Sequence, residues 1–188
     1  MNKKMYMVCF QIDKVLKEHP DRSILVAIDG MSASGKSTLG SLLKEKYQCN
    51  LFHMDDFFLR PEQRTEERLK EVGGNVDYER FKKEILNHLS DSEGLIYQRY
   101  NCSSKTLEEQ KKVPYCRLNI IEGAYSQHPY FKNIYDLRFF LTVSPEEQKR
   151  RIQNRNGEKQ LERFLKEWIP MENRYFETYQ IRSLSICL

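Results

Sequence analysis

The sequence predicts a single-domain α/β protein, built around a mainly parallel sheet that helices cover on both faces. Three observations predict this class. Short apolar runs recur along the chain and are typical of strands that are buried on both faces. Stretches with helical spacing of apolar residues lie between these runs, which is the order expected of a parallel sheet. The 188 residues are enough for one buried core and few for two domains.

Six apolar runs predict the strands. The first, SILVAID, is continuously apolar, and RLNIIEG and YDLRFFLTV have the same character. Two polar segments interrupt the pattern. SSKTLEEQKKVP is predicted to be a loop or hairpin, and the highly charged residues 61–74, which end in Gly73 and Gly74, are predicted to be a mobile excursion. In chain order the strand candidates span residues 23–29, 49–54, 94–101, 117–123, 135–143 and 183–188.

Five stretches predict helices. In the third, Phe81, Ile85 and Leu89 lie one turn apart on one face. The fourth follows Ser144, an N-cap candidate, with proline at the first helical position and two early glutamates. Pro170 interrupts the last stretch and is expected to kink or break it. The helix candidates span residues 10–18, 36–47, 77–91, 145–155 and 158–180.

Composition and charge exclude several classes of protein. With 39% hydrophobic and 31% charged residues, the chain has the make-up of a soluble globular protein. The net charge of +4 is mild, so we do not expect nucleic-acid binding. No run approaches the length of a membrane span, and the charged first residues do not form a secretory signal.

The cysteines also indicate where the protein works. They are odd in number, widely separated and free of CxxC spacing, so we expect neither a zinc site nor a disulfide framework. Free thiols favour the reducing cytoplasm, which is the predicted location. The sequence allows a homo-oligomer as well as a monomer. The five positions are Cys9, Cys49, Cys102, Cys116 and Cys187.

The most specific motif is DGMSASGKST, which contains the pattern GxxxxGK[ST] directly after the first strand and before a helix. Its glycines let the loop curl so that backbone N–H groups face the phosphates of a nucleotide, and the positive end of the helix adds to the attraction. Lys36 reaches the β- and γ-phosphates, and the Ser37 hydroxyl is placed to bind Mg²⁺. The predicted nucleotide-binding residues are Gly30, Ser32, Ala33, Ser34, Gly35, Lys36, Ser37 and Thr38.

The rest of the chain narrows the class of nucleotide-binding protein. A GTPase would carry an NKxD-type guanine motif downstream, which this sequence lacks, and a large ATPase machine would normally be longer. The size suits a small-molecule kinase. Phosphoryl transfer needs a carboxylate near the acceptor hydroxyl, and ligands of open α/β sheets bind at the carboxyl ends of strands. HMDDFF (53–58), which follows the second strand candidate, contains Asp55 and Asp56 at that place.

Several motifs together resemble the uridine kinases and their relatives, phosphoribulokinase and bacterial pantothenate kinase. The segments DGMSASGKST, MDDFFLRP, NVDYERF, NIIEG and KRRIQNRNG occur in the order seen in that family, from about residue 23 to residue 180. The resemblance implies a P-loop NTPase fold, with three α/β/α layers, a mainly parallel five-stranded sheet and a small helical lid around residues 146–160. It also implies that ATP and Mg²⁺ are used.

The resemblance assigns roles residue by residue. The acid of the D-x-F-[YF] element is the catalytic aspartate and corresponds to Asp55, which would also contact the acceptor. The acid of N-[FV]-D, which holds ribose hydroxyls, corresponds to Asp77. Glu122 matches the acid that supports Mg²⁺ together with Ser37, and the lid arginines correspond to Arg151 and Arg155. Tyr100, in QRYN, resembles a tyrosine near the base.

Some of these residues have simpler interpretations. Asp77 could cap the helix that starts at Tyr78, Glu122 could be a polar strand end, and Tyr100 could be a packing residue. The arginines could belong to a solvated helical face, whereas His53 and His128 are interpreted as structural. Asp56 is interpreted as a neighbour near Mg²⁺ or solvent.

The sequence departs from the family where NCSSK follows QRY, since uridine kinases often have a histidine there that contacts the base. We therefore expect a kinase for a small-molecule hydroxyl, with the 5′-hydroxyl of a nucleoside favoured. A same-fold kinase for pantothenate, a pyridine riboside or another alcohol, and a non-kinase nucleotide-binding switch, are the alternatives.

Overall fold

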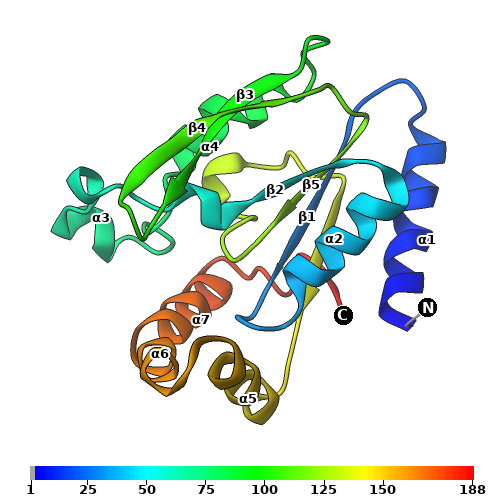
Figure 1. The fold of residues 1–188 in the computed structure, drawn as a ribbon. Coiled ribbons are helices and arrows are strands. Elements are labelled where there is room, and N and C mark those ends of the chain that lie inside the picture. The colour runs from blue at the N-terminus through cyan, green and yellow to red at the C-terminus, as the bar shows by residue number, and fades with distance from the viewer. Residues whose placement is uncertain (1–2) are drawn as a thin grey trace.

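A computed structural model describes residues 3–188 of the chain, and its centre is a five-stranded sheet with strand order β2-β5-β1-β6-β7 (Figure 1). Every pairing in this sheet is parallel, which confirms the predicted fold class. The carboxyl ends of the strands therefore meet at one edge, where ligands of such sheets bind. The strands are β1 (Ile24–Gly30), β2 (Asn50–His53), β5 (Leu118–Glu122), β6 (Leu137–Leu141) and β7 (Ile186–Cys187).

Helices cover both faces of the sheet and form two hydrophobic cores. On one face, α1 (Lys3–Glu18) and α2 (Lys36–Tyr47) contribute residues such as Val8, Ile12 and Leu43. On the other face, α4 (Tyr78–Glu84) and α7 (Ile169–Thr178) pack through Phe81 and Tyr175. Both layers are continuous because β1 and β5 are buried along their whole length, as their unbroken apolar runs predicted.

A separate antiparallel hairpin lies beside the main sheet. It consists of β3 (Leu95–Asn101) and β4 (Thr106–Val113). The polar segment before residue 114 thus forms the predicted hairpin, whereas GLIYQRYN is not a strand of the parallel sheet. The burial pattern gives the reason, because Leu95 and Tyr97 are buried while Ile96 between them is 52% exposed. Such alternation is typical of an antiparallel strand with one solvated face.

Residues 61–74 have more regular structure than their charge predicted. They contain a 3-10 turn, η2 (Pro61–Gln63), and a short helix, α3 (Glu66–Lys70). Arg68 holds the segment together, because its guanidinium donates to the carbonyls of Gly74 and Val76 and pairs with Glu79. The next stretch is a helix only to residue 84, followed by the 3-10 turn η3 (Leu86–His88).

The C-terminal helices carry the predicted caps and break. Helix α5 (Pro145–Asn156) begins after Ser144, whose hydroxyl accepts a hydrogen bond from the N–H of Glu147. Helix α6 (Glu158–Arg163) leads through a π-helical turn, η5 (Phe164–Trp168), into α7, which has Pro170 in its first turn. Two further 3-10 turns are η1 (Met54–Phe57) and η4 (Pro129–Phe131). Within residues 3–188, none of the helices is both long and apolar enough to cross a bilayer.

Candidate active site

The GxxxxGKS segment forms a curled loop between β1 and α2. Gly30 has φ 138° and Gly35 has φ 102°, backbone conformations that favour glycine. A Cβ atom on Gly30 would lie 2.2 Å from the Leu141 carbonyl oxygen, so only glycine fits against β6. The Lys36 ammonium crosses the loop and donates to the carbonyls of Gly30 (2.8 Å) and Met31 (3.0 Å). No side chain caps the start of α2, so its first N–H groups remain available to phosphate.

Three side chains from distant helices hold the tip of this loop. The Glu172 carboxylate on α7 accepts hydrogen bonds from the Ser32 N–H (3.0 Å) and the Ser32 hydroxyl (2.6 Å). On α5, Gln148 donates to the Ser32 carbonyl and Arg151 donates to the Ala33 carbonyl, each at 3.0 Å. The sequence did not single out Glu172 or Gln148, because no local pattern reveals a contact over more than 100 residues of chain.

The two predicted lid arginines have different surroundings. Arg151 lies against the P-loop through the Ala33 carbonyl, and its Nε donates to Glu147 (2.7 Å). Arg155, one turn further on α5, is exposed and donates to the side chain of its neighbour Asn156 (2.8 Å). Only the first of the two therefore touches the nucleotide-binding loop.

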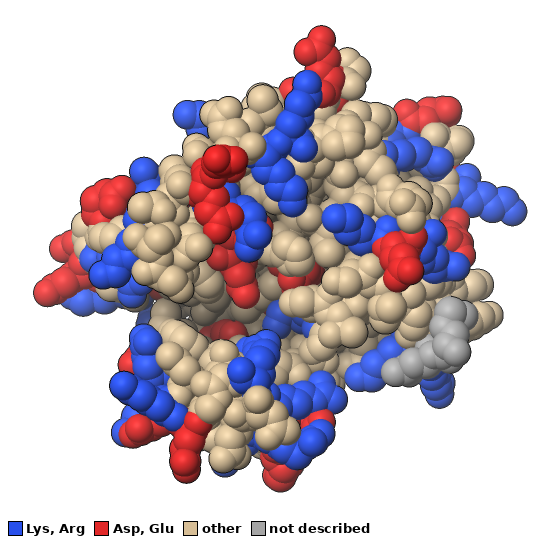
Figure 2. All heavy atoms as spheres, in the orientation of Figure 1, with Lys and Arg blue, Asp and Glu red and all other residues tan. Residues whose placement is uncertain are grey.

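Asp55 lies in η1, directly after the carboxyl end of β2. Its side chain is open to solvent but closely surrounded by protein, as expected of a carboxylate on the floor of a cleft. This crowding and the nearby Glu122 charge raise the pKa of Asp55, while the Lys36 ammonium acts in the opposite direction. Figure 2 shows a hollow, with acidic atoms on its floor, between the part of the surface over α5–α7 and the rest of this face.

Glu122 ends β5 and is buried, with a relative exposure of 4%. Its carboxylate hydrogen-bonds to Nδ1 of His53, which ends β2, and this contact raises the pKa of His53. His53 was interpreted as structural, and the structure adds that it hydrogen-bonds to a carboxylate of the candidate site. The oxygen donors of Glu122 and Asp55, with the exposed Ser37 at the start of α2, fit Mg²⁺, which prefers carboxylate and hydroxyl ligands. The charge of Glu122 acts on Asp55, and two carboxylates whose charges interact favour a cation between them.

Asp56 differs from its neighbour Asp55 in its burial and in its hydrogen-bond partners. It is buried, and its Oδ1 accepts a hydrogen bond from Nε of Arg99 on β3 (2.8 Å), while no group bonds its Oδ2. Asp56 was interpreted as a neighbour near Mg²⁺ or solvent, and the solvent part of this interpretation is wrong because the residue is buried. Its charge joins the hairpin to the end of β2. Only long-range geometry reveals this pairing, because 43 positions separate the two residues.

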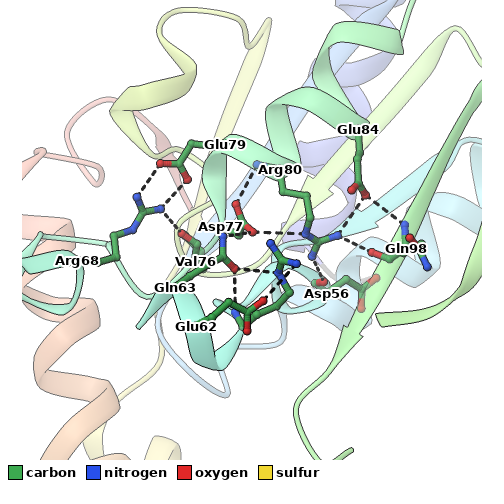
Figure 3. A network of polar contacts seen from close by, with 11 residues as sticks. Asp56, Glu62, Gln63, Arg68, Val76, Asp77, Glu79, Arg80, Glu84 and Gln98 are labelled. Atoms are coloured by element: carbon green, nitrogen blue, oxygen red, sulfur yellow. Dashed lines mark hydrogen bonds and ion pairs between the residues drawn. The ribbon is translucent and has the colours of Figure 1, made fainter. Parts of the chain in front are cut away.

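Asp77 caps α4, as one of its two sequence interpretations predicted. Its Oδ1 accepts from the Arg80 N–H (3.0 Å), and its Oδ2 accepts from the side-chain amide of Gln63 (2.7 Å). Arg80 extends from the same helix to Glu84 and to the Asp56 carbonyl (Figure 3). These polar groups border a cavity of about 360 Å³, which is lined by Arg60, Gln63, Asp77, Glu79, Arg80, Lys83, Glu84 and Leu107.

The remaining acceptor-side residues lie on the hairpin. Tyr100 is buried on β3, opposite Leu107 of β4, in agreement with its interpretation as a packing residue. Cys102, at the tip, is exposed. Partial desolvation and the Asp55 charge raise the pKa of its thiol. Arg64, in the segment before α3, acts on the same thiol in the opposite direction.

A second buried acid lies behind the P-loop. Asp29, the last residue before Gly30, has no solvent exposure, and burial raises its pKa to about 6. Its carboxylate accepts hydrogen bonds from the Gly30 N–H (2.7 Å), the Gln127 N–H (3.2 Å) and the Tyr175 hydroxyl (2.9 Å). These bonds satisfy both oxygens, so Asp29 fixes the start of the loop rather than facing a ligand.

Three of the solved structures with a similar fold are described as kinases or candidate kinases. A possible uridine kinase from Bacillus stearothermophilus is 20% identical, with a TM-score of 0.66, covering 97% of this chain and 99% of that one. A candidate fructose transport system kinase from Silicibacter sp. TM1040 is 22% identical, with a TM-score of 0.72 and coverages of 94% and 95%. D-glycerate 3-kinase from Cryptococcus neoformans is 12% identical, with a TM-score of 0.64 and coverages of 91% and 88%.

No protein-family model and no curated protein sequence matches the chain. The structural likeness shows the fold alone, an α/β fold with a P-loop and a parallel five-stranded sheet. It extends over nearly the whole chain in each comparison.

Proposed function

We propose that the chain is an ATP- and Mg²⁺-dependent kinase that phosphorylates a hydroxyl group of a small molecule, with the 5′-hydroxyl of a nucleoside as the acceptor. The observation that carries the proposal is the position of Asp55. It is a solvent-accessible carboxylate at the carboxyl end of β2, close enough to Lys36 of the P-loop for their charges to interact. Phosphoryl transfer to an alcohol needs a carboxylate at that distance from the phosphate-binding loop.

Each residue then has a definite task. The loop N–H groups and Lys36 bind the triphosphate, and Arg151 neutralises charge on the transferred group. Asp55 orients the acceptor hydroxyl and accepts its proton. Ser37 and Glu122 hold Mg²⁺, which supplies charge neutralisation when it is bound. The protein contributes mainly by positioning the groups and by preorganised electrostatics.

The hydrogen bonds that Asp77 already makes favour a second class of acceptor. Asp77 is 2% exposed and both of its oxygens already have hydrogen-bond partners, so a ribose diol would have to displace the Gln63 amide to reach Oδ2. An acceptor that does not place a ribose diol against Asp77, such as a small sugar acid or another alcohol, would leave this contact intact. Two proteins of the same fold are described as kinases related to fructose transport and to D-glycerate.

The test is ADP release by the purified protein with Mg-ATP, alone and with each member of a panel of nucleosides, vitamins, sugars and glycerate. We expect at least one acceptor to raise the rate about tenfold or more, and the Asp55→Asn variant to abolish that gain. Faster turnover of uridine than of deoxyuridine would support the diol contact at Asp77, and equal turnover would argue for the second class. If no acceptor raises the rate in a broad panel, the kinase proposal is wrong.

A further inference from the structure

The tip of the P-loop contains a strained residue. Ala33 has φ 58°, in the left-handed region that residues with a Cβ rarely adopt. This conformation is unfavourable for an alanine, and it persists only where the surrounding structure holds it. Within the loop, the Ser34 N–H donates to the Met31 carbonyl (3.1 Å), and contacts from outside the loop add to this restraint.

The contacts come from α5 and α7, and they surround the peptide units on both sides of Ser32. Gln148 and Arg151 bind the carbonyl oxygens of Ser32 and Ala33. Glu172 accepts hydrogen bonds from the N–H and the hydroxyl of Ser32. Glu172 is 8% exposed, so little water is at hand to replace the bonds that it makes.

The shape of the C-terminal helix directs Glu172 towards the loop. The π-helical turn Phe164–Trp168 immediately precedes α7 and adds one residue to the helical path. Without that residue, the side chains of α7 would be turned by about 100° around the helix axis. Pro170, which lacks an N–H group, lies just after the turn and makes a regular α-helix unfavourable there. The break that Pro170 predicts thus has a consequence at the P-loop.

We propose that Glu172 is a positioning residue of the nucleotide site, which holds Ser32 and the strained Ala33 in the phosphate-binding conformation before the nucleotide arrives. This inference rests on the proposed function in that the loop binds the phosphates of ATP. Glu172 acts through the loop backbone, since both of its carboxylate oxygens are engaged by Ser32. Without it, part of the binding free energy of the nucleotide would be used to order the loop.

The experiment is a calorimetric titration of the full chain with Mg-ATP. Glu172→Ala is expected to raise the Kd about tenfold or more, since it removes two hydrogen bonds to a charged, buried acceptor. Glu172→Gln is expected to stay within about threefold of the wild type, because its amide can accept from the Ser32 N–H and donate to the hydroxyl. Glu177→Ala, an exposed glutamate on the same helix, is the matched control and should leave the Kd unchanged.

The titration separates positioning from a general loss of folding. Unfolded protein lowers the number of binding sites per chain and leaves the Kd of the remaining sites unchanged. In turnover assays with an accepted substrate, the KM for ATP should rise while the KM for the acceptor stays the same. If Glu172→Ala does not yield folded protein, Glu172→Asp, whose carboxylate is one methylene shorter, carries the same expectation.

Two results overturn the inference alone. One is a Glu172→Ala or Glu172→Asp variant that binds Mg-ATP within about threefold of the wild type. The other is a Glu172→Gln variant as weak as Glu172→Ala, because hydrogen bonding would then not be the cause. Lys36→Ala provides the reference for loss of the phosphate site. If the wild-type chain binds no Mg-ATP, the proposed function fails and the inference fails with it.

Discussion

Asp55 and Asp56 are adjacent in sequence, yet the same substitution should mainly lower activity at Asp55 and mainly lower stability at Asp56. The fold disfavours the charge of Asp55, because crowding and Glu122 raise its pKa. A carboxyl group with a raised pKa contributes stability at low pH and loses that contribution as the pH rises through the folded value. Above the folded pKa, the charge of Asp55 is therefore a cost to folding, and Asp55→Asn should leave the melting temperature unchanged or raise it.

The substitution at Asp56 removes a charge that the fold uses. Asp56 is 6% exposed in its side chain, whereas its partner Arg99 is 53% exposed and can be solvated when the pair is lost. The cost should thus lie between that of a buried and that of a surface ion pair, at about 1 kcal/mol, because asparagine can still accept the hydrogen bond from Arg99. For a chain of this length, about 1 kcal/mol lowers the melting temperature by about 2–4 °C.

The assay combines thermal unfolding with turnover of the best acceptor from the panel. Asp55→Asn should lower kcat by about 10²–10⁴-fold, the range for removal of a general base, with the affinity for ATP retained. Asp56→Asn should keep kcat within about threefold of the wild type. The reasoning is refuted if Asp56→Asn loses the activity while Asp55→Asn keeps it, or if Asp55→Asn is the less stable variant.

Further predictions concern the lid, the acceptor site and pH. Arg151→Ala should raise the KM for ATP about tenfold and Arg155→Ala less than about threefold, because only the first contacts the P-loop. Gln63→Ala frees one oxygen of Asp77, so the KM for a ribonucleoside should fall while that for its 2′-deoxy analogue stays constant. Burial lowers the pKa of His128 from 6.5 to about 4, so neutral His128 stabilises the fold above pH 6.5 and this contribution is lost as the pH falls towards 4. Urea unfolding should therefore show the wild type losing about 3 kcal/mol relative to His128→Phe over that range, and a constant difference would contradict the assignment.

The sequence predicted the parallel sheet because its strands are short, apolar and buried on both faces. β1 and β5 have these properties along their whole length, and each is recognisable without knowledge of its neighbours. GLIYQRYN was predicted as a strand, but its sequence did not show that it pairs with β4 outside the main sheet. The burial of β3 alternates, but its apolar side chains at Leu95, Ile96 and Tyr97 form a run in the sequence that conceals the alternation.

The candidate site also contains some residues that the sequence could identify and others that it could not. Residues within a local motif, such as Lys36, could be identified because the backbone between the motif positions is short and its geometry is known. Glu172 could not, because it contacts the loop over 140 positions and its direction depends on a π-helical turn. The pairing of Asp56 with Arg99 could not be identified from the sequence either. This pairing indicates that Asp56 has a structural role beside Asp55.

The charges around Lys36 explain why these long-range contacts matter. Asp29, Asp55 and Glu172 all have carboxylates whose charge interacts with the Lys36 ammonium. A triphosphate would add several negative charges to this neighbourhood, and like charges at close range repel strongly where water is scarce. The fold limits that repulsion, since Asp29 and Glu172 are engaged by loop N–H and hydroxyl groups. Asp55 is the acid whose charge stays open to solvent, and a site that presents one accessible carboxylate to the phosphates is suited to activate a hydroxyl.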